Sequence, residues 1–97
     1  MKRTNDQPLK DVRARLVRRE GMRQPLLEVR IREIWHQDMG DYINRYTRFL
    51  RLKGGVLEIG ITSSGLRDEL HYSKTKITSF LNERLGEEVI QDVVIRS

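Results

Sequence analysis

Residues 63–86 constrain the fold most, because they carry the clearest helical pattern in the chain. Their apolar side chains fall on one side of a wheel that turns ~100° per residue, at Leu66, Leu70, Ile77, Phe80 and Leu81. Ser63 or Ser64 can accept a hydrogen bond from the first free N–H groups, and Gly86 suits a left-handed end. Ser73 keeps the phase in the middle, so we expect one uninterrupted helix whose apolar stripe covers a small sheet.

Two segments with alternating polarity precede this helix. Leu50 and Leu52 alternate with charged residues over residues 47–53, and the pattern resumes over residues 56–62. The Gly54-Gly55 pair between them is typical of a two-residue turn, because glycine tolerates positive φ. These features predict a β-hairpin with one buried face.

A last strand is expected after the helix, over residues 89–96. Ile90, Val93 and Ile95 do not keep one strict parity, which indicates either a bulge or a strand buried on both faces. This strand has to return to the sheet after a helical crossover.

Helical patterns also precede the hairpin. Residues 24–39 carry a narrow apolar arc, and Gly40 stops or kinks this helix before a short helical turn that Asp41 can cap. Residues 8–20 show a shorter, basic amphipathic pattern that Glu20-Gly21 ends. We therefore expect a helix in two parts on either side of Gly40, with a marginal helix ahead of it.

Together these elements predict one α+β domain. Its order is helix, helix, strand, strand, helix, strand, with a small three-stranded sheet and the helices packed on one face. Residues 24–97 form the folded domain in this interpretation, and residues 1–23 form a basic N-terminal extension that is partly disordered or a short helix. A chain of 97 residues suggests no second domain.

Charge is unevenly distributed along the chain. Residues 1–53 contain 14 Lys and Arg against seven Asp and Glu, whereas residues 54–97 contain five against seven. A basic half joined to a mildly acidic half favours a polyanionic partner on one side of the molecule, and we place nucleic acid ahead of simple solubility.

The cellular compartment is inferred from the cysteine content and from the length of the apolar segments. It has no cysteine, which excludes disulfides and thiolate metal sites and fits a reducing environment. No apolar run approaches the ~20 residues of a membrane span. We expect a cytoplasmic protein without a membrane partner.

Catalytic and cofactor motifs are absent from the sequence. His36 and Asp38 stand two residues apart on a helix and do not converge on a metal. Ser73-Lys74-Thr75-Lys76 matches an S-x-x-K string, but its companion motifs are missing, as are a Walker loop and a G-x-G-x-x-G run. We expect no enzyme activity, no cofactor and no metal.

A basic and aromatic cluster is the strongest candidate site. Its cations are Arg45, Arg48, Arg51 and Lys53, and its rings are Tyr42, Tyr46 and Phe49. This composition suits single-stranded nucleic acid, because cations meet phosphates and rings stack on bases. An equally good interpretation makes the rings core residues and the cations a protected strand edge. Lys74 and Lys76 either extend the surface or are simply solvated.

Trp35 is the only tryptophan. On the apolar arc it is best interpreted as a core residue. If part of its ring is exposed, it becomes a candidate hot spot for binding a protein partner.

Several short pieces in continuous order carry a resemblance to a known family. They are Trp35 with Gly40, Tyr46-Thr47-Arg48, Gly55-Val56-Leu57, Ile61-Thr62-Ser63-Ser64, Glu69-Leu70 and Leu81-Asn82-Glu83-Arg84-Leu85-Gly86. This ordered set spans roughly residues 24–96 and resembles the DciA-like family of bacterial proteins. The resemblance implies a KH-like domain that binds the DnaB-type replicative helicase and DNA and helps to place the helicase on a single strand.

Two departures from that pattern shape the expectation. A nucleic-acid-binding KH domain grips the backbone with a G-x-x-G loop, whereas residues 71–76 here contain no glycine. Binding is therefore expected to come from side-chain charge and stacking. Many relatives also carry a long flexible extension after the domain. Here either the basic N-terminal segment serves instead or the function is reduced.

The sequence thus predicts a non-enzymatic accessory factor of DNA replication that binds the helicase and single-stranded DNA. The cations expected to hold phosphates also include Arg13, Arg15, Arg18 and Arg19. One alternative is a protein-interaction module that never touches nucleic acid. Another is an RNA-binding, ribosome-associated factor.

Overall fold

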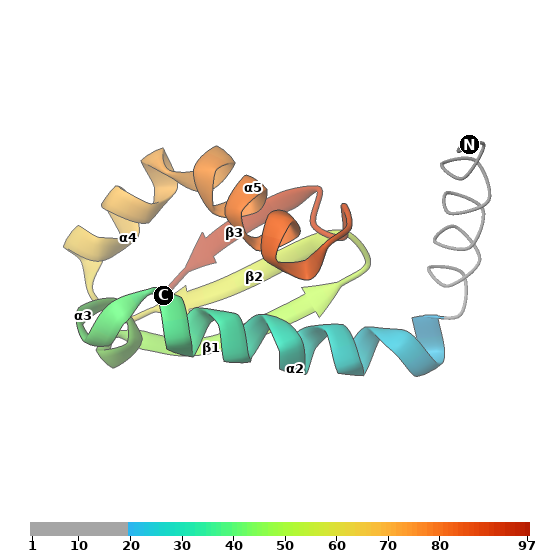
Figure 1. Cartoon of the computed structure of the whole chain (residues 1–97). Helices are drawn as coiled ribbons and strands as arrows, with labels where there is room; N and C mark the ends of the chain where they lie inside the picture. Colours follow the sequence, from blue (N-terminus) through green and yellow to red (C-terminus); the bar gives the residue numbers. More distant parts are fainter. Residues whose placement is uncertain (1–19) are drawn as a thin grey trace.

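The fold is a three-stranded sheet with helices both before its first strand and between its second and third strands (Figure 1). The computed structural model describes residues 20–97, so most of the helix expected over residues 8–20 lies outside the described residues. The elements in order are α2 (Glu20–Asp38), α3 (Gly40–Arg45), β1 (Thr47–Lys53), β2 (Val56–Ile61), α4 (Ser64–Tyr72), α5 (Lys74–Leu85) and β3 (Asp92–Arg96).

The sheet has the order β1-β2-β3, with β1 antiparallel and β3 parallel to β2. The predicted hairpin is confirmed, and Gly54 takes the positive φ of +60° that its turn requires. The predicted crossover is confirmed as well: α4 and α5 connect β2 to the parallel β3 (Figure 1).

One hydrophobic core joins the helices to a single face of the sheet. Its fully buried members come from α2, β2, α4, α5 and β3: Trp35, Ile31, Ile34, Leu57, Ile59, Ile61, Leu66, Leu81 and Val93. Trp35 is 1 % exposed, and its Nε1 donates to Thr47 Oγ1 at 3.0 Å. The α+β class with helices on one face is confirmed, its order agrees with a KH-like arrangement, and Trp35 is a core residue.

The outer edge of β1 is covered by polar side chains of α2. The Leu52 N–H donates to Glu28 Oε2 at 2.8 Å, and Gln24 Nε2 donates to the Leu52 carbonyl at 2.9 Å. Arg32 Nη2 donates to the Leu50 carbonyl at 3.4 Å. These contacts satisfy edge groups that would otherwise be free to pair with another strand.

Helix α2 begins earlier than predicted. Glu20 and Gly21, expected to end a preceding helix, belong to α2, and Pro25 lies inside it. Proline removes one i−4 hydrogen bond there. Two residues before it, Arg23 forms an ion pair with Glu87, which connects this part of α2 to the segment after α5.

The helix in two parts around Gly40 is confirmed, with Gly40 at φ +85°. The capping role expected for Asp41 is wrong. Met39 occupies the N-cap position without a side-chain hydrogen bond, and Asp41 lies in the first turn of α3, where the helix dipole favours a carboxylate.

The single helix expected over residues 63–86 is wrong. Ser63 and Gly86 cap its two ends as predicted, but the helix breaks at Ser73, which has φ −104° and ψ 14°. Leu70 and Ile77 stand seven residues apart, close to two helical turns, so the apolar phase persists through a break of one residue. The break lets α4 pack on β2 and β3 while α5 packs on β3 and α2.

The last strand is shorter than predicted. It begins at Asp92, and the buried Ile90 lies in the preceding connection, which removes the apparent mismatch of parity. Neither alternative for this strand holds, since β3 lies at the edge of the sheet, and a register shift occurs in β1, between Thr47 and Phe49.

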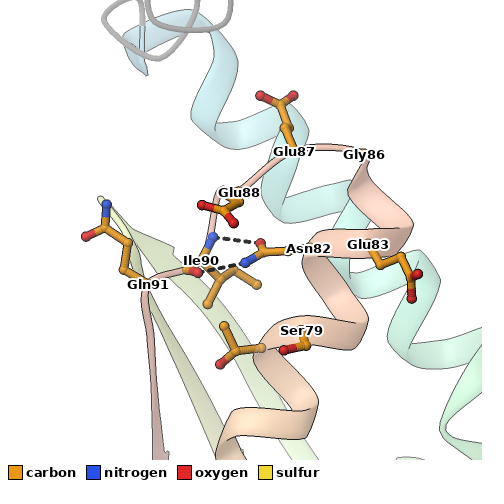
Figure 2. Close-up of a pocket in the computed structure, with 9 residues that line it drawn as sticks. Ser79, Asn82, Glu83, Gly86, Glu87, Glu88, Ile90 and Gln91 are labelled. Carbon is orange, nitrogen blue, oxygen red and sulfur yellow. Dashed lines mark hydrogen bonds between the residues drawn. The ribbon is translucent and has the colours of Figure 1, made fainter. Parts of the chain in front are cut away.

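Asn82 organises the connection between α5 and β3 (Figure 2). Its Oδ1 accepts from the N–H groups of Val89 and Ile90 at 3.1 and 2.9 Å, and its Nδ2 donates to the Ile90 carbonyl at 2.8 Å. The side chain thereby satisfies three backbone groups that no strand pairs.

Within residues 20–97, no helix combines the length and apolar character needed to cross a bilayer.

Replacing Asn82 with Ala should lower the free energy of unfolding by about 2–3 kcal/mol, because partly buried backbone groups lose their partners. Urea denaturation measures the change. The control is Ser79→Ala. Ser79 is exposed, lies one turn earlier on α5 and lines the same hollow between α5 and β3 as Asn82, so its replacement should leave the midpoint nearly unchanged. Equal effects of the two variants would show that the Asn82 hydrogen bonds do not stabilise the fold.

Candidate nucleic-acid interface

The sheet face opposite the core is here called the open face. Every second residue of each strand points its side chain toward it. Register places Phe49 opposite Gly60, Arg51 opposite Glu58 and Lys53 opposite Val56. On the parallel side, residues 56, 58 and 60 pair with residues 92, 94 and 96. The open face therefore consists of Phe49, Arg51, Lys53, Val56, Glu58, Gly60, Asp92, Val94 and Arg96, and its charged residues other than Glu58 are exposed.

The bulge in β1 adds Arg48 to this face. Thr47 pairs with Ile61 and Phe49 with Gly60, so Arg48 is the extra residue between them. Its Cζ lies 5.7 Å from the centroid of the Phe49 ring, and its Nη1 donates to the Ser97 carbonyl at 3.4 Å. Without the bulge, strict alternation would direct Arg48 and Phe49 to opposite faces.

Glu58 is the carboxylate at the centre of the open face. It lies 3.8 Å from Arg51 Nη1 and 3.3 Å from Arg96 Nη2, and its side chain is 15 % exposed. Arg51 and Arg96 remain 54 % and 58 % exposed, so each keeps donors free for another anion. The cations of this face outnumber its two carboxylates, Glu58 and Asp92, so its net charge is positive. These cations are Arg48, Arg51, Lys53 and Arg96.

Phe49 lies directly over Gly60. A Cβ atom at Gly60 would stand 2.3 Å from Phe49 Cε2, which is closer than real contacts allow. The Arg51 guanidinium lies over the same ring, with its Cζ 4.3 Å from the ring centroid, a cation–π distance. Gly60 thus has a packing role: only a residue without a side chain admits the ring.

The structure separates the other predicted site residues from the open face. Arg45 is exposed at the end of α3, where Tyr42 and Tyr46 pack edge to face with centroids 5.5 Å apart. Lys74 and Lys76 lie at the start of α5, in the helical layer. The remaining predicted cations, Arg13, Arg15, Arg18 and Arg19, lie outside the described residues.

Sequence reasoning missed Glu58, Gly60 and Arg96 as parts of this surface. The alternation within β2 and β3 contained the information, because residues 58 and 60 share a parity opposite to the buried Leu57 and Ile59. Their position beside the cations of β1 also depends on the register between the two strands, which the sequence of a single segment does not reveal.

Two hollows elsewhere in residues 23–97 have a different chemistry. The one between α5 and β3 is lined by the acidic Glu83, Glu87 and Glu88, which would repel phosphate (Figure 2). The other, between α3 and α4, is lined by Tyr42, Tyr72, Glu69, Ser73 and apolar side chains. In this part of the chain no three ligand-type side chains gather in a way that could hold a metal ion.

The fold and this surface define a small α+β domain with a cationic sheet face. A family model described as Dna[CI] antecedent, DciA, matches residues 8–95. The chain therefore belongs to the DciA family, as its sequence resemblance indicated, and shares that family's involvement in loading the DnaB-type helicase during replication. No curated protein shows significant similarity to the chain.

Gly60→Ala should destabilise the domain by about 1–3 kcal/mol, because its methyl group displaces the Phe49 ring. In a Phe49→Ala background the same change should cost less than about 1 kcal/mol, since the conflicting ring is gone. Urea denaturation of the four proteins gives the coupling. Equal costs in both backgrounds would show that Phe49 does not pack on Gly60.

Proposed function

We propose that this protein is a non-enzymatic accessory factor that holds single-stranded DNA on the open face while it assists the placement of the DnaB-type helicase. The observation that carries the proposal is the gathering of Arg48, Arg51, Lys53 and Arg96 on the sheet face opposite the core. Family membership supplies the helicase and the replication context.

Electrostatics supports the choice of a polyanion. Guanidinium groups form paired hydrogen bonds with phosphate oxygens, and each contact releases counterions from the strand. Residues 71–76 surround the break at Ser73, where a KH domain would present glycines, and they contain no glycine to bring the backbone close to a phosphate. Side-chain charge on the open face takes that role in this proposal, and Arg13, Arg15, Arg18 and Arg19 would add contacts from the N-terminal segment.

Removing Arg48 and Lys53 together should weaken binding to single-stranded DNA about ten-fold and flatten its salt dependence. The slope of log K against log salt should fall by about 1.4, because each lost phosphate contact accounts for about 0.7. Fluorescence anisotropy between about 50 and 200 mM salt measures both quantities.

The matched control is Lys74→Ala with Lys76→Ala. It removes the same charge from the helical layer and should leave the slope nearly unchanged. A wild-type affinity that does not respond to salt would contradict the electrostatic account. A larger loss from the lysine pair would move the DNA site to the helical layer.

A separate surface suits the helicase. Tyr72 is 90 % exposed and Tyr42 is 56 % exposed, and both line the hollow between α3 and α4 together with Leu66 and Leu70. Exposed tyrosines beside an apolar hollow are typical of protein interfaces. Because this hollow is formed by helices and not by the open face, one molecule can hold DNA and the helicase at once.

Replacing Tyr42 and Tyr72 with Ala should weaken binding to the replicative helicase about ten-fold, as expected for loss of an aromatic contact, and leave single-strand affinity unchanged. Surface-immobilised helicase and labelled oligonucleotide give the two readouts. Leu26→Ala with Val29→Ala, exposed apolar residues on α2, is the control. Loss of helicase binding only in the control would place the interface on α2.

Binding measurements distinguish this proposal from the two alternative functions that the sequence suggested. A protein-interaction module without a nucleic-acid role would bind the helicase at full strength and DNA not at all. An RNA-binding factor would prefer single-stranded RNA in direct competition with DNA of the same sequence.

A further inference from the structure

Phe49 is an aromatic residue of the sheet that does not belong to the hydrophobic core. It sits on the open face, whereas the core cluster of residues 23–97 takes in Trp35, Tyr46 and Phe80. One edge of its ring lies against Gly60, and the Arg51 guanidinium lies over the ring. We call this ordered set, Gly60, Phe49 and Arg51, the stack.

The outer layer of the stack remains available to a ligand. The Arg51 side chain is 54 % exposed, and its Cζ stands 4.3 Å from the Phe49 centroid. Aromatic rings and guanidinium planes are the two side-chain groups on which unstacked bases settle in single-strand complexes. The stack offers both groups in one place.

Glu58 makes the centre of this face unfavourable for phosphate. Its carboxylate contacts Arg51 and Arg96 and offsets part of their charge there. Arg48 forms no ion pair within the described residues, and the same holds for Lys53. A strand that follows the charge therefore places its phosphates at these flanking cations and an uncharged group at the centre.

We propose that the stack is a subsite for an unpaired DNA base, with the neighbouring phosphates held by Arg48 and Lys53. A duplex does not present the faces of its bases, since they are covered by their neighbours. The subsite therefore selects single strands over duplexes by base contact, independently of charge. Glu58 acts as a positioning residue that holds the Arg51 guanidinium beside the ring. This inference rests on the proposed DNA-binding function and deepens it.

The test compares Phe49→Leu with the wild-type chain on three probes of equal length: a thymidine oligonucleotide, its abasic counterpart and a duplex. Stacking on one aromatic side chain is worth about ten-fold in affinity. Phe49→Leu should lose about that factor on the thymidine strand. It should bind the abasic strand and the duplex as the wild type does, because those probes offer no free base face.

Two further variants separate stacking from folding and from charge. Phe80→Leu makes the same chemical change in the helical layer and should bind all three probes normally. Arg51→Lys keeps the charge but removes the plane, so it should weaken thymidine binding while abasic binding is retained.

Each outcome bears on one statement. Wild-type protein that binds no probe contradicts the proposed function itself. Wild-type protein that binds the thymidine and abasic strands equally, with Phe49→Leu unchanged, overturns the subsite and leaves the electrostatic function standing. Equal losses in Phe49→Leu and Phe80→Leu would likewise overturn it, because the effect would then come from general destabilisation.

Discussion

Burial of a single sheet face governs this structure. The connection from β2 to the parallel β3 runs through α4 and α5, and a crossover of this kind lies on one side of its sheet. Helix α2 packs on the same side through Ile31, Ile34 and Trp35. Since side chains alternate along a strand, this arrangement leaves the other half of the strand residues on the open face.

The composition of that open face follows the same alternation. Leu50 and Leu52 enter the core, and their neighbours Arg51 and Lys53 necessarily point away from it. The bulge at Arg48 and the small Gly60 are the two local departures that add a cation and an aromatic ring. A one-sided core thus separates two surfaces: a cationic sheet face, to which the proposed function assigns DNA, and a helical layer with exposed tyrosines, to which it assigns the helicase.

Local patterns predicted the elements better than their assembly. The hairpin was predictable because alternation and Gly54-Gly55 act within a few residues. The break at Ser73 was not, since the periodicity of Leu70 and Ile77 is the same with or without it, and contacts with distant strands decide it. For the same reason the sequence grouped Lys74 and Lys76 with the strand cations and did not reveal Arg96, whose position depends on the register of β3 with β2.

The proposed function requires DNA to lie on the open face. This can be tested by mapping the amide chemical shifts of the protein during titration with single-stranded DNA. We expect the largest changes along residues 48–53, 58–60 and 94–96, with small changes around Ser73. Changes concentrated at residues 71–76 with an unperturbed sheet would contradict the claim, because the strand would then follow the helical turn.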